Sequence, residues 1–173
     1  MLDAIAEAFS GDRELFKGLW IYNSDYGFEK HPVIRIDMGN IANKTDEALE
    51  NELSIELMKR VRLEGFSFEY KTPPAIFKTL IEELHIKHGQ RVVVLIDEYD
   101  KPILDHLDNP DASEANRKVL KSFYGILKSM DPHIRMAFVT GVSKFSKSSI
   151  FSEMNNMMDI TLTKNTPTSV ESK

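Results

Sequence analysis

Asp97 and Glu98 are adjacent residues with carboxylate side chains, and their place in the sequence makes a chemical role plausible. They directly follow Val92 to Ile96, an aliphatic run that is too short to cross a membrane and too uniformly apolar for a strand with one wet face. The run predicts a central strand of a parallel sheet, buried on both faces. Open α/β sheets bind ligands beyond the carboxyl ends of their strands. The two carboxylates are therefore expected at a ligand-binding edge.

An apolar strand ending in Asp-Glu is typical of the Walker B motif of P-loop nucleotidases, in which the Asp helps to hold Mg²⁺ on the nucleotide phosphates. In one branch of that superfamily the following Glu polarises the attacking water. Because side chains alternate along a strand, Asp97 and Glu98 can point in different directions, one to a metal and the other to water. The alternative is that the pair only ends the strand and begins a turn before Lys101.

A longer pattern surrounds this pair. It consists of Leu95-Ile-Asp-Glu-Tyr-Asp-Lys-Pro102, then Phe138-Val-Thr-Gly-Val-Ser-Lys-Phe-Ser146, and then Ser149-Ile-Phe-Ser152 with Asn155, Asn156 and Asp159-Ile-Thr161. These blocks resemble the bacterial AAA-ATPase-like family, over about residues 1–162. The resemblance implies an ATP-binding and ATP-hydrolysing P-loop domain. In that family the domain is commonly joined to a C-terminal domain of the PD-(D/E)XK nuclease type.

The resemblance also implies roles for four residues, with ATP and Mg²⁺ as cofactors. Asp97 would hold Mg²⁺ through water, and Glu98 would polarise the attacking water. Thr140 would sense the γ-phosphate or position the water, although a strand-end Thr bonded to the backbone is an equal alternative. Lys144 would contact phosphate or a neighbouring subunit.

The phosphate-binding loop is not found in its usual form, because no Gly-Lys-Ser or Gly-Lys-Thr occurs. The nearest imitation, residues 141–148, has Ser146 where the second Gly belongs, and a side chain there obstructs the approach of a phosphate to the backbone. The family places the loop immediately before Met1, and the helix expected there has no upstream cap. We therefore expect a fragment that binds ATP and Mg²⁺ weakly and hydrolyses little ATP alone.

Composition indicates one globular domain, with 42% hydrophobic and 28% charged residues. A net charge of −5 argues against a broad nucleic-acid or anionic-membrane surface, so nucleic acid would be contacted only through the nuclease-like domain. The chain has no cysteine and no apolar run long enough to span a membrane. We expect a cytoplasmic protein with no membrane contact.

Strand and helix patterns alternate, which predicts an α/β fold: a parallel sheet flanked by helices, forming an incomplete P-loop NTPase core. The expected strands are residues 33–37, 91–96 and 134–140. Helices are expected to begin at Met1, Thr45, Thr72 and Asp111, and residues 101–110 are expected to form a loop. The partial ATPase domain would cover residues 1–162, with a disordered tail at residues 163–173.

Two further expectations concern surfaces. An apolar group is expected to pack under the sheet, with base stacking by its one Trp as the alternative; it consists of Leu15, Phe16, Leu19, Trp20 and Ile21. Strand 134–140 is expected at an unpaired sheet edge, which invites self-association.

Two other functions stay open: a protein-interaction module without nucleotide chemistry, and a magnesium-dependent nuclease component. Such nucleases use an Asp followed by Glu-x-Lys on strands. Here Glu98 and Lys101 are three residues apart, but they fall on the turn after the strand.

Overall fold

The computed structural model describes residues 1–142, 150–151, 158 and 160. Its sheet has three parallel strands in the order β1-β2-β3. They are β1 (Val33–Asp37), β2 (Val92–Asp97) and β3 (Ile134–Val139). The predicted α/β class is confirmed, and the acidic strand β2 is central.

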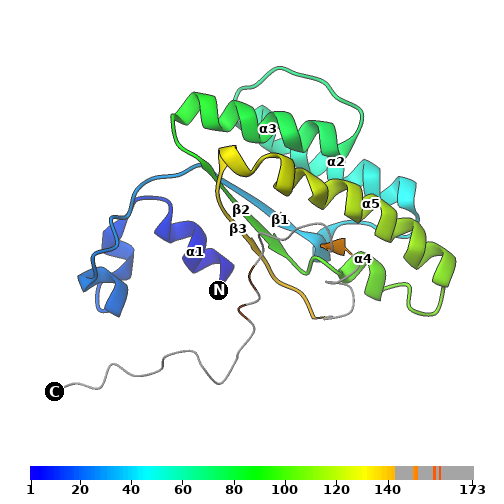
Figure 1. Cartoon of the computed structure of the whole chain (residues 1–173), viewed down its shortest axis with the longest axis horizontal. Coiled ribbons are helices and arrows are strands. Elements are labelled where there is room, and N and C mark those ends of the chain that lie inside the picture. The colour runs from blue at the N-terminus through cyan, green and yellow to red at the C-terminus, as the bar shows by residue number, and fades with distance from the viewer. Residues whose placement is uncertain (143–149, 152–157, 159, 161–173) are drawn as a thin grey trace.

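Helices cover both faces of the sheet (Figure 1). The α-helices are α1 (Leu2–Ala8), α2 (Asp46–Leu63), α3 (Pro73–His88), α4 (Lys101–Leu104) and α5 (Pro110–Ser129). Short 3₁₀ helices span Arg13–Phe16, Trp20–Asn23, Met38–Asn40 and Asp131–His133. One face carries α2, α3 and α5, and the other carries α1, so the fold has three layers.

Burial of β2 explains why it organises the fold. Each residue from Val92 to Ile96 is 0% exposed, as the apolar run predicts. Alternate side chains face opposite layers: Val94 packs in the large cluster with α2, α3 and α5, and Val93 packs with Leu2 and Phe9. Full burial of each such side chain contributes roughly 1.5–3 kcal/mol. The strand that carries the candidate site is thereby fixed from both sides.

Local signals placed most helix ends correctly. The Thr45 side chain accepts a hydrogen bond from the Ala48 amide at 3.2 Å, which caps α2. Gly89, with φ of 63°, ends α3. The predicted cap of α5, Asp111, was two residues late, because Asn109 caps the helix and Pro110 occupies its first turn. The expected loop 101–110 was also wrong in part, since its first four residues form α4.

The expected packing of the apolar group at residues 15–21 is wrong. Leu15, Leu19 and Trp20 are 58%, 58% and 76% exposed. Phe16 is buried, but in a separate small cluster with Phe28 rather than under the sheet. The physical reason is that α1 already covers the sheet face, and two 3₁₀ helices of four residues each present no continuous apolar side.

Strand β3 has β2 on one side and, within the described residues, no strand on the other. Beyond Ile134 its side chains are half-buried or exposed. The position at a sheet edge agrees with the sequence, and self-association through this edge stays a prediction. The predicted tail at residues 163–173 lies outside the described residues. No helix in the described part is long and apolar enough to cross a membrane.

Candidate functional site

The carboxyl ends of all three strands bring polar side chains to one edge of the sheet. Asp37 at the end of β1 is the register partner of Asp97 at the end of β2. Thr140 directly follows β3, and its amide donates to the Ile96 carbonyl at 2.9 Å. Because the strands are parallel, three separate stretches of sequence meet here.

Asp97 and Thr140 are in direct contact. The Thr140 hydroxyl donates a hydrogen bond to Oδ1 of Asp97, so it bonds a side chain rather than the backbone. The backbone reinforces this pairing, since the Tyr99 amide donates to the Thr140 carbonyl at 2.9 Å. A hydrogen bond to an ionised carboxylate is stronger than one between neutral groups. The arrangement fixes the orientation of the Asp97 carboxylate.

Glu98 turns away from Thr140. Its φ of 51° lies in the left-handed region, which is uncommon for a residue other than glycine. A Cβ added to Gly39 would lie 2.8 Å from Oε2 of Glu98 and 3.0 Å from Oδ1 of Asp37. The Glu98 carboxylate therefore lies on the β1 side, against the glycine and near Asp37. The two adjacent carboxylates diverge, but strand alternation is not the reason: β2 ends at Asp97, and the left-handed backbone of Glu98 sets the direction of its side chain.

Asp37 serves the turn that the sequence predicted for it. Its carboxylate accepts hydrogen bonds from the Gly39 amide at 2.9 Å and from Nδ2 of Asn40 at 2.6 Å. These bonds hold a second negative charge near Glu98. Like charges in proximity repel, so this side of the edge favours a cation or a hydrogen-bond donor.

The donor set at Asp97 fits a magnesium ion that is held mainly by phosphates and water. Mg²⁺ commonly takes one or two carboxylates together with substrate phosphates, and it keeps several waters. Oδ1 of Asp97 accepts from Thr140 and from the Glu98 amide, while Oδ2 has no hydrogen bond within the described residues. The described residues contain no group of three or more His, Asp or Glu that could hold a metal ion. An all-protein metal cage is therefore not present in this part of the chain.

Sequence reasoning missed Asp100 and Gly141. Asp100 is completely buried, and both of its carboxylate oxygens accept from the Val142 amide at 3.2 Å. Gly141 packs against the Tyr99 ring and the Asp100 carboxylate. The glycine directly after Thr140 was the available signal, because close approach of backbone often requires glycine. Lys144 lies outside the described residues, so its predicted role stays a prediction.

Polar contacts tie α4 to the loop that follows β1. Lys101 and Asp105 form an ion pair at 2.5 Å, and Nδ2 of Asn43 donates to Asp105 at 3.0 Å. The hydrogen bond from Lys101, followed by that from Asn43, lowers the pKa of Asp105 despite partial desolvation. Nε2 of His106 contacts the Asn43 carbonyl at 2.7 Å, and buried Asn116 donates to the same carbonyl at 2.8 Å. These contacts hold the β1 side of the edge.

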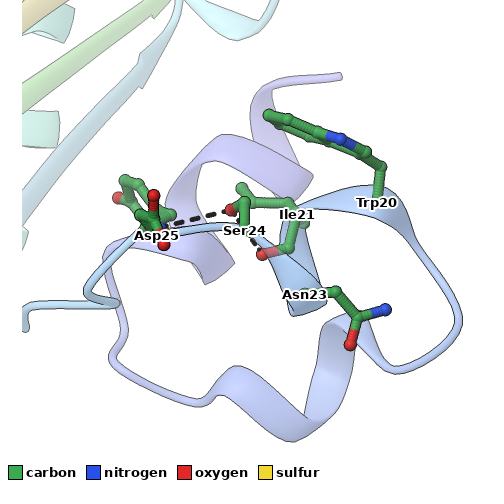
Figure 2. A pocket seen from close by; sticks show the side chains of 6 residues that line it. Trp20, Ile21, Asn23, Ser24 and Asp25 are labelled. Carbon is green, nitrogen blue, oxygen red and sulfur yellow. Dashed lines mark hydrogen bonds between the residues drawn. The ribbon is translucent and has the colours of Figure 1, made fainter. Parts of the chain in front are cut away.

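A hollow of about 480 Å³ lies elsewhere, in the N-terminal segment (Figure 2). Its lining comes from one short stretch: Trp20, Ile21, Asn23, Ser24, Asp25 and Tyr26. The Ser24 hydroxyl donates to the Ile21 carbonyl at 2.8 Å and accepts from the Tyr26 amide, so it serves the local turn. Figure 1 places this segment far from α4 and the carboxyl edge. The hollow therefore takes no part in the candidate site.

A parallel sheet whose central strand ends at Asp97, followed by Glu98, beside a strand followed directly by Thr140, is an α/β arrangement consistent with the P-loop-like class. The model of the family described as predicted AAA-ATPase matches residues 1–151, and the chain belongs to this family.

One curated relative is an uncharacterized protein in the vnfD 5' region of Azotobacter chroococcum mcd 1. It is 40% identical over 161 residues, which cover 93% of this chain and 31% of the relative. The chain thus spans less than a third of that protein's length. No solved structure matches the chain.

Proposed function

We propose that this chain carries the magnesium-holding and water-activating edge of an ATP-hydrolysing domain. The observation that supports this proposal most strongly is the hydrogen bond from Thr140 to Asp97 at the carboxyl end of the buried strand. It orients one carboxylate while the adjacent Glu98 points in another direction. Family membership supports the same class of activity.

In this proposal Asp97 holds Mg²⁺ through water, and Thr140 keeps the carboxylate oriented. Bound Mg²⁺ neutralises charge on the phosphates of ATP. The Thr140 hydroxyl lies beside the carboxylate, where it can also sense a terminal phosphate or position a water. Asp97 would need no further protein carboxylate, because Mg²⁺ usually takes one or two carboxylates together with substrate phosphates and water.

Glu98 is proposed to accept a hydrogen bond from the attacking water and draw its proton. General base catalysis of this kind contributes about 10²–10⁴-fold to a rate. The carboxylate is suited to the role because it has no hydrogen-bond partner within the described residues, and a water can therefore bind it. Glu98→Gln should retain ATP binding and lose hydrolysis.

We expect this chain to bind the phosphates of ATP weakly. Its 173 residues contain no Gly-Lys-Ser or Gly-Lys-Thr. Backbone amides of a glycine-rich loop and its Lys normally provide most of the attraction for a triphosphate. We propose that the chain binds Mg·ATP weakly, in the millimolar range, with Lys144 as a phosphate contact.

Backbone amide NMR during titration with millimolar Mg·ATP tests this function. We expect saturable shifts at Asp97, Glu98 and Thr140 that are lost in Asp97→Asn and retained in the matched control Asp108→Asn, which changes an exposed carboxylate. ATP without Mg²⁺ should shift these amides less. Absence of saturable shifts at this edge, or equal shifts in Asp97→Asn, would overturn the proposal and favour an interaction module.

A further inference from the structure

We propose that Asp100 is a positioning residue whose buried carboxylate, together with Gly141, clamps the chain leaving β3 and thereby holds Thr140 against Asp97. The catalytic meaning of this clamp rests on the function proposed above. Its existence does not, because it concerns the path of residues 140–142 alone.

The direction of the Asp100 side chain is the first argument. Asp100 occupies the N-cap position of α4, where an Asp usually accepts hydrogen bonds from the first amides of its own helix. Here the side chain makes no such bond. Both carboxylate oxygens instead accept from the amide of Val142, which follows a different strand. The side chain therefore joins two strand ends rather than capping a helix.

Burial is the second argument. Asp100 is 0% exposed, and a buried carboxylate is strongly unfavourable unless hydrogen bonds compensate for its lost hydration. A surface Asp would cap α4 without that cost. The bonds to Val142 are thus part of what makes the buried position tenable, and they fix the chain two residues beyond Thr140.

The fit of Gly141 is the third argument. A Cβ on this residue would overlap the Tyr99 ring and would lie 2.6 Å from Oδ1 of Asp100. The ring has little room to move, because it is 5% exposed and packs against Tyr124 and Phe151. The backbone after β3 therefore lies directly on Tyr99 and Asp100.

Thr140 lies inside this closed arrangement. Its amide donates to Ile96 and its carbonyl accepts from Tyr99, each at 2.9 Å. Strand ends normally fray, and local opening there would separate the Thr140 hydroxyl from Asp97. The clamp at Asp100 and Val142 lies just beyond the last of these bonds, where it opposes fraying most directly.

A residue of helix α5 is hydrogen-bonded to the segment that carries the clamp. The Tyr124 hydroxyl donates to the Tyr99 carbonyl at 3.0 Å. Complete burial, reinforced by the negative charge of Asp100, raises the pKa of Tyr124 well above its ordinary value. The phenol therefore stays protonated and remains a donor to the segment between Glu98 and Asp100.

Amide hydrogen exchange tests the clamp without any nucleotide. In Asp100→Asn we expect exchange at Tyr99, Thr140 and Val142 to accelerate by about tenfold or more, as loss of a charged hydrogen bond would give. In Gly141→Ala we expect the same amides to accelerate, because the new methyl group would overlap the Tyr99 ring and the Asp100 carboxylate. The control is Ile81→Val, a buried change on α3 that lowers global stability by a comparable amount. Acceleration confined to these amides supports the clamp. Unchanged exchange, or acceleration equal to that in Ile81→Val, overturns it.

Mg·ATP titration of the same variants tests the positioning role. Weaker binding by about threefold to tenfold in both variants, at unchanged affinity in Ile81→Val, supports it. If exchange accelerates while affinity is unchanged, positioning is overturned and the clamp is only structural. If the wild-type chain shows no Mg·ATP response, the proposed function fails and positioning for it is overturned, while exchange still decides whether the clamp exists.

Discussion

The two sides of the Asp97–Glu98 pair differ in how firmly they are held. On the β3 side, Asp97 accepts the Thr140 hydroxyl, and buried Asp100 joins the following backbone. On the β1 side, the Glu98 carboxylate rests against Gly39 without a hydrogen bond in the described part of the chain. The difference suits the proposed roles. A carboxylate that orients an ion benefits from preorganisation, whereas one that takes a proton from water needs access to it.

Two glycines, one on each side, offer the strongest test of this comparison. Neither Gly141 nor Gly39 has a positive φ, so an added methyl group causes no left-handed backbone strain at either site, and the difference between the two costs reports packing. Gly141→Ala should lower the free energy of unfolding by about 1–3 kcal/mol, because the buried Tyr99 ring and Asp100 cannot yield. Gly39→Ala should change it by less than about 1 kcal/mol, because the new methyl meets the movable end of Glu98 and needs a shift of only a few tenths of an ångström from Oδ1 of Asp37, 3.0 Å away. Urea denaturation measures both, and equal costs would contradict the comparison.

Removal of the Thr140 hydroxyl should have the next largest effect. Thr140→Val keeps the shape and strand preference of the residue but leaves Asp97 without that donor. We expect a loss of about 1 kcal/mol in unfolding free energy, measured by urea denaturation, and weaker Mg·ATP binding by NMR. Thr79→Val, a change at a half-buried Thr of α3, is the matched control. A variant with wild-type affinity would show that the hydrogen bond does not orient the carboxylate.

Glu98→Gln should leave stability almost unchanged, within about 0.5 kcal/mol, because the carboxylate has no hydrogen bond to lose in the described part of the chain. Loss of the negative charge near Asp37 should even favour the folded state slightly. Thermal and urea denaturation check this expectation against Glu69→Gln, an exposed control. Strong destabilisation would mean that Glu98 is held as firmly as Asp97.

The smallest effect is expected from the ion pair that supports the β1 side. The hydrogen bond from Lys101 lowers the pKa of Asp105 below its ordinary value of 3.8 in the folded protein. The stability that Asp105 contributes is therefore complete above that ordinary value and is lost as the pH falls through the lowered one. Asp105→Asn should remove this part of the pH dependence of the unfolding free energy. Near neutral pH it should change the unfolding free energy little, since exposed ion pairs contribute little and are screened by salt. Urea denaturation at a series of acidic pH values measures this dependence, with Asp108→Asn as control. Equal slopes of unfolding free energy against pH in the wild-type chain and in Asp105→Asn would show that the pair is not formed.

Local patterns were sufficient for much of the fold. The aliphatic run at Val92–Ile96 predicted a strand buried on both faces, and each of its residues is fully buried. Thr45 and Gly89 marked helix ends because capping and left-handed backbone depend on neighbouring residues only. The pattern failed at Trp20, since its exposure depends on α1 having already filled the sheet face.

The sequence by itself determined the α/β class and the central acidic strand, because these follow from hydrophobic pattern and capping. Only the tertiary structure decided what each carboxylate contacts. Asp100 became a buried link to Val142, and Glu98 came to rest on Gly39, because residues far apart in sequence are brought together by the parallel register of three strands. That register depends on packing of the whole core, which no local stretch of sequence encodes.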